Sequence, residues 1–318
     1  MNQTKAASAA AGGKAVMSGG ALLVIGIAVV IVVVAGFLLA SSTGKASGNA
    51  GNGGTNSTGY ASGSDAIAQA FASNQTLTGA QLANITEQYS KSVGPMNITY
   101  KGKISGNTNS GNNFTTSLSN RYNETYMHEN GDFVADMLLS STDRIHNPYY
   151  SNNVTALTHS ITIGFSNMTS YSCSDILNIT PPDPQVIGKG FSCIKGSYLN
   201  STLFNFSNQF GSTPYVKYHL VGKSSVIGIP CDELAGTGAL NSSTANIPIS
   251  ISVNITTCVS FKYMAWLSYN MSFRQTSSAY NFTSISTTTG TATALNNNVP
   301  ANFTQLPQNA ILISSRQG

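Results

Sequence analysis

Charged residues are scarce in this sequence of 318 residues. Only 8% of the residues are Asp, Glu, Lys or Arg, against about 25% in an ordinary soluble domain. Small neutral polar residues take their place, with 43 Ser, 32 Asn and 32 Thr. A net charge of +4, from 15 basic and 11 acidic residues, is too small and too scattered for a nucleic-acid-binding protein. The composition also argues against a typical cytosolic enzyme.

Catalytic and metal-binding motifs are missing as well. His128, His146, His159 and His219 stand alone, without the H-E-x-x-H spacing of a zinc protease, and we expect them to be structural. Ser192 lacks the second glycine of a G-x-S-x-G nucleophile turn. The sequence therefore predicts a protein that is not an enzyme and that uses no cofactor.

One long apolar run dominates the N-terminal region. Ala21 to Ala40 are twenty consecutive residues without a charge, Asn, Gln, Ser or Thr, and as a helix they would span about 30 Å, the thickness of a bilayer's hydrocarbon core. We predict a cytoplasmic tail over residues 1–19, a transmembrane helix over 20–40, a flexible Gly/Ser/Asn-rich linker over 41–64 and a β-rich domain over 65–318. The excess of positive charge before the helix predicts a single-pass protein of the cell membrane, with a cytoplasmic N-terminus and an extracytoplasmic C-terminal domain.

Two other interpretations of this run stay open. A cleaved secretory signal is one, although its apolar region is normally shorter, about 7 to 15 residues. The other rests on Lys14 to Met17, which resemble the processing site of archaeal class III signals. That resemblance implies a pilin-like filament subunit on an archaeal cell surface, but Ser18 to Gly20 separate the site from the apolar run.

Acceptor sites for asparagine glycosylation are more frequent than composition explains. Seventeen N-x-[ST] sequons occur, whereas chance would give about 7.5. Sixteen of them follow the predicted membrane helix, and their asparagines are Asn56, Asn74, Asn84, Asn97, Asn113, Asn123, Asn153, Asn167, Asn178, Asn200, Asn205, Asn241, Asn254, Asn270, Asn281 and Asn302. We therefore predict a glycoprotein, with its sequon asparagines on the solvent side of strands.

Apolar and polar residues alternate through much of the C-terminal domain, which is typical of strands with one buried face. From Ile247 to Phe273 nearly every odd position is apolar, whereas Trp266 falls on the even, mainly polar face. This pattern predicts two strands joined by an odd-length turn near Lys262 to Met264. Further alternating segments are 96–104, 114–122, 215–221, 225–234 and 280–285, with Asn130-Gly131 as a hairpin signal. Helices are expected at 78–93 and, on a weaker pattern, at 198–210.

All four cysteines lie in the predicted β-rich domain. Four cysteines allow three pairings, and because neighbouring strands in sequence tend to pair, we predict disulfides between Cys173 and Cys193 and between Cys231 and Cys258. The alternative, a zinc site of four thiolates, lacks a C-x-x-C pair. Disulfides are typical of an extracytoplasmic protein.

The order of these elements resembles the lipid and lipoprotein carriers of the LolA/LppX type. The resemblance rests on a helix leading into the segment that starts at Met96, on the Ile227-Gly-Ile segment before Cys231, and on a closing Val-x-x-x-Phe-x-x-x-Pro segment that starts at Val299. It implies a strongly bent antiparallel sheet, a half-barrel, with one or two covering helices and an apolar cavity. The implied partners are the membrane and a lipid or acylated protein. Dense sequons, disulfides and a helical anchor depart from the family pattern.

An apolar ligand would then contact the helix at 78–93 and the long alternating segment. The residues assigned to this ligand face are Leu82, Ile85, Tyr89, Ile255, Phe261, Leu267, Tyr269, Met271 and Phe273. In the alternative interpretation, the protein's own helices and loops fill the core. The protein would then be a structural or adhesive glycoprotein of the cell envelope.

Overall fold

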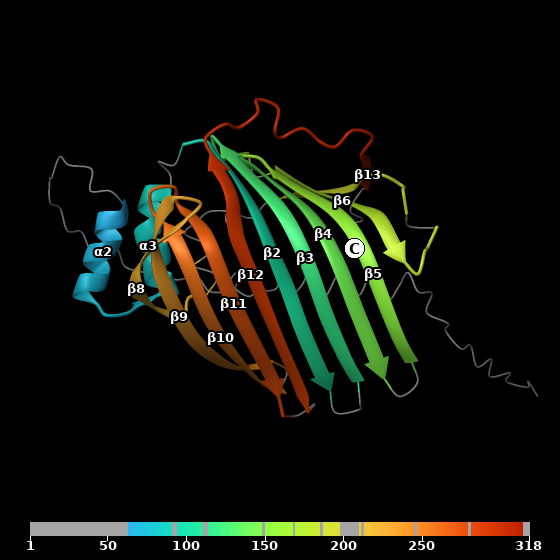
Figure 1. The fold of residues 1–318 in the computed structure, drawn as a ribbon, viewed down its shortest axis with the longest axis horizontal. Coiled ribbons are helices and arrows are strands. Elements are labelled where there is room, and N and C mark those ends of the chain that lie inside the picture. Colours follow the sequence, from blue (N-terminus) through green and yellow to red (C-terminus); the bar gives the residue numbers. More distant parts are fainter. Residues whose placement is uncertain are drawn as a thin grey trace, which may run out of the picture.

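The computed structural model describes residues 63–90, 94–110, 114–147, 150–167, 169–184, 187–197, 210, 213–244, 247–278 and 281–313. Within these residues a single sheet of thirteen strands makes up most of the fold, and two helices lie at one end of it (Figure 1). The prediction of an antiparallel sheet is confirmed, because every pair of neighbouring strands is antiparallel except β7 and β13.

Most of the strands are long, and ten of the thirteen have at least 10 residues. Their bounds are β1 (Leu77–Thr78), β2 (Met96–Ser110), β3 (Phe114–Glu129), β4 (Asp132–Asn147), β5 (Tyr150–Gly164), β6 (Thr169–Thr180), β7 (Ser192–Ser197), β8 (Lys217–Val226), β9 (Ile229–Thr244), β10 (Ile247–Ser260), β11 (Ala265–Ser277), β12 (Phe282–Asn296) and β13 (Ile311–Ile313). Their order in the sheet is β1-β8-β9-β10-β11-β12-β2-β3-β4-β5-β6-β7-β13. The meanders β2 to β7 and β8 to β12 therefore meet where β12 pairs with β2.

The helices are α2 (Gly63–Ser73) and α3 (Gly79–Ser90). A capping box starts α3. The backbone N–H of Gln81 donates to Thr78 Oγ1 over 3.2 Å, and the backbone N–H of Thr78 donates to Gln81 Oε1 over 2.8 Å. The helix predicted at 78–93 is thus confirmed as α3, whereas α2 was not predicted. Most of the segment predicted as a helix at 198–210 lies outside the described residues.

The main core lies between the two helices and one end of the sheet. Ile67 and Phe71 of α2 and Leu82 of α3 are buried there against side chains of β8 to β11, among them Tyr218 and Val253. These apolar positions are spaced so that each helix presents one stripe to the sheet. A second, smaller cluster contains Met96, Ile98, Cys231, Cys258, Ala265, Leu267 and Ala292.

Two tight turns have opposite outcomes for the sequence predictions. Asn130 and Gly131 join β3 to β4 with φ angles of 52° and 87°, as a two-residue hairpin of this composition requires. Ile227 and Gly228 also form a turn, with φ angles of 49° and 75°, between β8 and β9. The strand predicted at 225–234 is therefore wrong in its first part. The Ile-Gly-Ile segment that supported the carrier resemblance lies at a hairpin turn.

A β-bulge explains how the long alternating segment keeps its pattern. The turn at 261–264 has four residues, an even number, because Ser260 pairs with Ala265. The register then shifts, so that Val259 pairs with Trp266 but Cys258 pairs with Ser268. The extra residue restores the alternation, and the predicted odd-length turn is wrong. As a consequence Trp266 packs in the main core and Leu267 in the second cluster.

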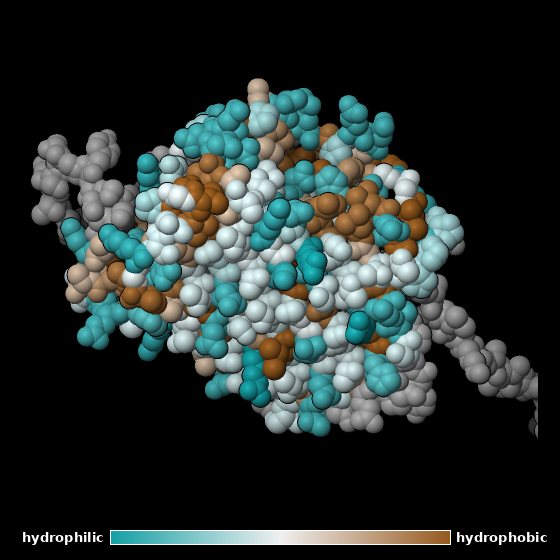
Figure 2. Space-filling model, viewed as in Figure 1, coloured by the Kyte–Doolittle hydropathy of each residue, from teal (hydrophilic) through white to brown (hydrophobic). Residues whose placement is uncertain are grey.

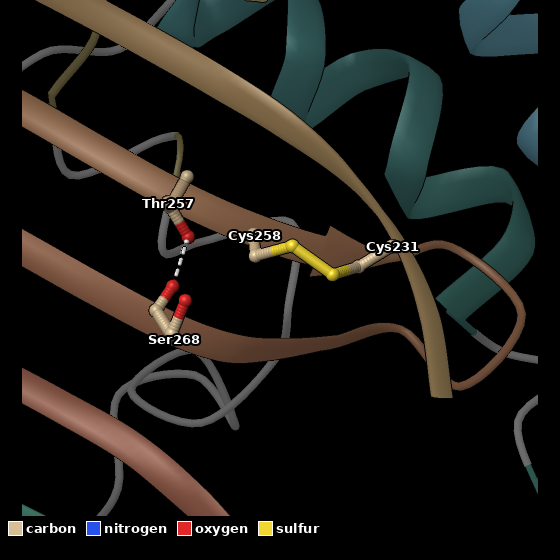
Figure 3. Close-up of a disulfide and its surroundings, with 4 residues drawn as sticks. All are labelled: Cys231, Thr257, Cys258 and Ser268. Atoms are coloured by element: carbon tan, nitrogen blue, oxygen red, sulfur yellow. Dashed lines mark hydrogen bonds between the residues drawn. A yellow bond between two sulfur atoms is a disulfide. The ribbon is translucent and has the colours of Figure 1, made fainter. Parts of the chain in front are cut away.

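Both predicted disulfides are confirmed. Cys173 and Cys193 are directly opposite each other on β6 and β7, with their Cα atoms 4.0 Å apart. Cys231 and Cys258 join β9 to β10, with a Cα separation of 5.4 Å (Figure 3). Beside this bond Thr257 Oγ1 donates to the Ser268 carbonyl over 2.9 Å. All four cysteines of the sequence are therefore oxidised.

The predicted half-barrel is not observed. The thirteen strands form an open sheet, with β1 at one edge and β13 at the other. These edge strands have only two and three residues, which is too short a ladder to close the sheet on itself.

The prediction of a single-pass membrane protein is also corrected. In the part of the chain that the structure describes, no helix is long and apolar enough to cross a membrane. The two helices have 11 and 12 residues, whereas a spanning helix needs about 20. The span predicted over 20–40 lies outside the described residues, so no described element supports the anchor.

Candidate functional site on the inner face of the sheet

The two faces of the sheet differ in chemistry. Directly opposite residues on paired strands point to the same side, and the register therefore places Tyr269 of β11, Gly290 of β12, Gly102 of β2 and Tyr122 of β3 on one face. Tyr269 packs against the main core beneath the helices. We call this side the inner face and the opposite side the outer face.

The helices cover part of the residues predicted to contact an apolar ligand. Leu82, Ile255 and Phe261 are buried in the main core. Their side chains therefore pack against other parts of the protein and not against a ligand. Half-buried side chains at the edge of this core are Ile85, Tyr269, Met271 and Phe273. Leu267 lies in the second cluster because of the bulge, and the Tyr89 side chain is outside the described set. The structure thus brings seven of the nine predicted residues together.

A pair of tyrosines extends the inner face beyond the helices. The hydroxyls of Tyr122 and Tyr269 are in hydrogen-bonding contact, and the Tyr122 hydroxyl also donates to the Thr289 carbonyl over 3.0 Å. Between β3 and β11 lie β2 and β12, where Gly102 and Gly290 are directly opposite each other. A Cβ atom at either glycine would overlap a tyrosine ring. The two rings therefore lie over a glycine pair.

Tyr100 and Trp266 join this aromatic group. The Tyr100 hydroxyl donates to the Trp266 carbonyl over 2.9 Å. Its ring lies 6.3 Å from that of Tyr269, and the Trp266 ring lies 6.2 Å from that of Tyr269. Burial raises the pKa of Tyr100 and Tyr269 well above the usual value and that of Tyr122 to about 12. These hydroxyls are therefore neutral at physiological pH.

Glu124 lies among these tyrosines. It is directly opposite Tyr100, and Tyr122 and Tyr126 flank it on the same face of β3. Its side chain is half-buried, and burial raises the pKa of its carboxyl to about 7. Among the described residues no basic side chain pairs with it. Glu124 is thus an acid held near its titration point in an aromatic setting.

Further polar groups of the inner face have no hydrogen-bonding partner. Asn120 is only 1% exposed, and neither its Nδ2 nor its Oδ1 atom has a partner. The same holds for Asp143 Oδ1 on β4, and burial raises the pKa of that carboxyl. Buried polar atoms in native proteins nearly always have a partner, whether protein, water or ligand. This part of the inner face therefore offers polar groups that a bound molecule can satisfy.

Charge is segregated between the faces. In the described parts of β2 to β5 the basic residues are Lys101, Lys103, Arg121 and Arg144, all of which are exposed on the outer face. The acids Glu124 and Asp143 lie on the inner face, where His128 has its pKa lowered by burial. The inner face of these strands is consequently acidic or neutral.

The outer face carries an open pocket of about 640 Å³ near the ends of β2 to β5 and β12. Its wall includes Arg144 and His146 and the sequon asparagine Asn153, together with Asn107 and Ser117. None of its described lining residues carries a carboxylate. The pocket therefore combines hydroxyl, amide and basic side chains with apolar surface, which includes Ile145 and Ile285.

Sequon asparagines gather on exposed surface, as the alternation predicts. The exposed ones are Asn74, Asn84, Asn123, Asn153, Asn167, Asn178, Asn241, Asn254, Asn270, Asn281 and Asn302. Asn97 is half-buried, and its Nδ2 donates to the Asn298 carbonyl over 3.2 Å. The surface over β2–β5 and β10–β12 in Figure 2 is mostly pale or teal, which fits an outer face of Ser, Thr and Asn. Asn56, Asn113, Asn200 and Asn205 lie outside the described residues.

One predicted structural histidine has a charged partner. His159 Nε2 lies 2.7 Å from Asp136 Oδ1 on the neighbouring strand, and the Phe191 ring contacts the imidazole edge-on at 5.0 Å. The part of the chain that is described contains no group of three His, Cys, Asp or Glu side chains able to hold a metal ion. We assign the His159 pair a structural role in joining β4 and β5.

The sequence predictions placed Tyr269 on the ligand face but missed Tyr100, Tyr122 and Glu124. Those predictions considered only apolar residues for the ligand face. The signal was nevertheless present in β3, where Leu118, Asn120, Tyr122, Glu124 and Tyr126 occupy alternate positions. Their period of two places the carboxyl of Glu124 on the same face as the tyrosines.

Comparison with known proteins does not identify a family. No family model matches the chain, and no curated protein matches it. A DUF1329 family protein from Desulfovibrio piger ATCC 29098 shares 12% identity over 71% of this chain and 95% of its own, with a TM-score of 0.23. The beta domain of the Bordetella autotransporter BrkA shares 7% identity over 61% of this chain and 98% of its own, with a TM-score of 0.25. The translocator domain of autotransporter NalP from Neisseria meningitidis shares 9% over 65% and 94%, with a TM-score of 0.23.

Structural similarities with TM-scores this low do not establish the fold or the function of this chain. The resemblance to LolA/LppX carriers is likewise not confirmed. What stands is a β-rich protein with one large sheet and two disulfides.

Proposed function

We propose that this chain is an extracytoplasmic, non-catalytic binding protein that holds an apolar or amphiphilic ligand, such as a lipid, against the inner face of its sheet. The extracytoplasmic setting is supported by the oxidation of all four cysteines, since disulfides persist in oxidising compartments. The exposed sequons are consistent with the same setting.

The observation that carries the proposal is the uneven cover of the inner face. The described helices α2 and α3 pack only over the β8–β11 end. Beyond it, on β3 to β5, the inner face continues with half-buried apolar side chains such as Leu118, Leu139 and Val154. Asn120 lies among them with both polar atoms unpartnered. An apolar wall with a few polar groups is typical of small-molecule sites.

Neighbouring residues of β4 give a matched test. Leu139 lies on the inner face opposite Tyr122, whereas Leu138, 37% exposed, lies on the outer face. We expect the purified full-length chain to carry lipid detectable by mass spectrometry and to take up a fluorescent fatty acid. Leu139→Gln should weaken fatty-acid binding about tenfold, because it places an amide in the apolar wall.

Leu138→Gln should bind the fatty acid as the wild type does. Absence of bound lipid together with no uptake would refute the proposal. Equal loss of binding in both variants would also count against a site on the inner face.

A structural or adhesive glycoprotein of the cell envelope is the second candidate function. It is favoured by the outer face, where exposed Ser, Thr and sequon Asn residues dominate. Carbohydrate attached to these residues without any bound lipid would select this function over the first.

A further inference from the structure

We propose that the carboxyl of Glu124, with the tyrosines around it, binds the cationic head group of an amphiphilic ligand, in the form of an ammonium group. This inference rests on the proposed function and narrows its ligand class. The Glu124 carboxyl would thus determine which polar head group binds, whereas the apolar side chains of the inner face would contact the rest of the ligand.

The geometry of the site supports a cation. Tyr100, Tyr122 and Tyr126 stand at three neighbouring positions around Glu124 on one face of β2 and β3. Aromatic rings grouped around an anionic side chain form the usual setting for substituted ammonium groups, which are attracted to the negative faces of the rings. Tyr269 adds a fourth ring through its contact with Tyr122.

Charge complementarity favours a cationic head group over an anionic one. In the described parts of β2–β5 and β10–β12, every Lys and Arg lies off the inner face, and the only acids on that face are Glu124 and Asp143. A phosphate or carboxylate head group would meet two carboxyls there and no Lys or Arg, and the one histidine of that face, His128, has its pKa lowered by burial. An ammonium group would instead supply the counter-charge that Glu124 lacks.

The site is reachable as well as sheltered. Glu124 keeps part of its surface exposed although protein surrounds it, and burial raises the pKa of its carboxyl. A sheltered carboxylate attracts a cation more strongly than an exposed one, because less water screens the pair. The nearby Asn120 amide provides hydrogen bonds for a further polar group of the ligand.

Three probes that share one alkyl chain separate charge from apolar binding. We would titrate the full-length chain with decyltrimethylammonium, decanol and decanoate below their aggregation concentrations. Trp266, the single tryptophan, lies 6.2 Å from Tyr269 and reports binding through its fluorescence. Calorimetry gives the affinities independently.

We expect the ammonium probe to bind about tenfold more tightly than decanol, and decanoate to bind most weakly. Glu124→Gln should abolish the preference for the ammonium probe and leave the affinity for decanol unchanged. Glu129→Gln, on the outer face of the same strand, should keep the preference.

Two results would overturn the inference while leaving the proposed function intact. One is equal affinity of the wild type for the ammonium probe and decanol, and the other is an equal loss of preference in both glutamine variants. Failure of all three probes to bind would overturn the proposed function and this inference together.

Discussion

Tyr122 and Tyr269 bring their hydroxyls into contact although two strands separate β3 from β11. Because the Tyr122 hydroxyl donates to the Thr289 carbonyl, Tyr269 must donate to Tyr122. The link joins the β8–β12 meander, which packs on the helices, to the β2–β7 meander. It therefore makes the tyrosine and glutamate group continuous with the core of the fold.

The glycines beneath the two rings should tolerate no side chain. We expect Gly102→Ala to lower the free energy of unfolding by about 1 to 3 kcal/mol, since the new Cβ overlaps the Tyr122 ring and the Thr289 carbonyl. Urea denaturation measures the change. Gly106→Ala on the same strand is the control, because its Cβ would meet its nearest neighbour at 3.5 Å. Equal destabilisation by both substitutions would contradict the ring contact.

Stability should depend on pH through Glu124. The pKa of the Glu124 carboxyl is about 7 in the folded protein, above its value in the unfolded chain. The contribution of this carboxyl to the free energy of unfolding is therefore fully present below the unfolded pKa. That contribution is lost as the pH rises through about 7. We expect Glu124→Gln to match the wild type near pH 4 and to exceed its free energy of unfolding by roughly 2 kcal/mol at pH 8.

Denaturant titrations at several pH values measure this difference between the two proteins. Glu233→Gln on β9 provides the matched substitution at a site outside the aromatic group. If Glu124→Gln is no more stable than the wild type at pH 8, Glu124 does not cause this pH dependence.

Each disulfide should contribute to stability independently. Replacing Cys231 and Cys258 together by Ala opens a loop with a sequence separation of 27, and we expect a loss of about 3 to 4 kcal/mol from the entropy of the unfolded chain. The Cys173 and Cys193 pair, with a separation of 20, should cost a similar amount. Thermal unfolding with and without reductant measures both. In a variant that lacks both disulfides, reductant should leave the melting temperature unchanged. A lower melting temperature would show that reductant destabilises the protein by another route.

Occupancy of the predicted glycosylation sites should follow exposure. Asn254 is exposed on β10, whereas Asn97 is half-buried and its Nδ2 donates to the Asn298 carbonyl. A glycan attaches through this nitrogen, so we expect Asn254 to be modified and Asn97 to be unmodified. Peptide mass spectrometry of the native protein decides it. Modification of Asn97 but not of Asn254 would contradict this order.

Local sequence patterns predicted much of the sheet. The alternation of apolar and polar residues can be recognised within a few residues, and so can the residues of a tight turn. The pairing of Cys231 with Cys258 and the turn at Asn130 were both foreseen in this way. The face of Trp266 was not, since it depends on one bulge that shifts the register. Helix α2 was missed because Ile67 and Phe71 are too few to define a stripe.

Long-range features of the candidate site were beyond such patterns. The open form of the sheet depends on which strands end at its edges, and β13 is only three residues long. The contact between Tyr122 and Tyr269 requires the pairing of β12 with β2, which joins residues far apart in the sequence. Alternation alone places both tyrosines on a buried face but gives no reason for them to meet.

The outer face, rich in hydroxyls and amides, has a consequence for how the protein responds to its surroundings. Salt weakens interactions between exposed charges. The outer face carries only scattered exposed charges, such as Lys101 and Arg121, whereas its many Ser, Thr and Asn side chains are uncharged and do not titrate. Hydration of this surface should thus vary little between fresh water and brine. Sensitivity to the medium is concentrated in a few sheltered carboxyls, above all Glu124.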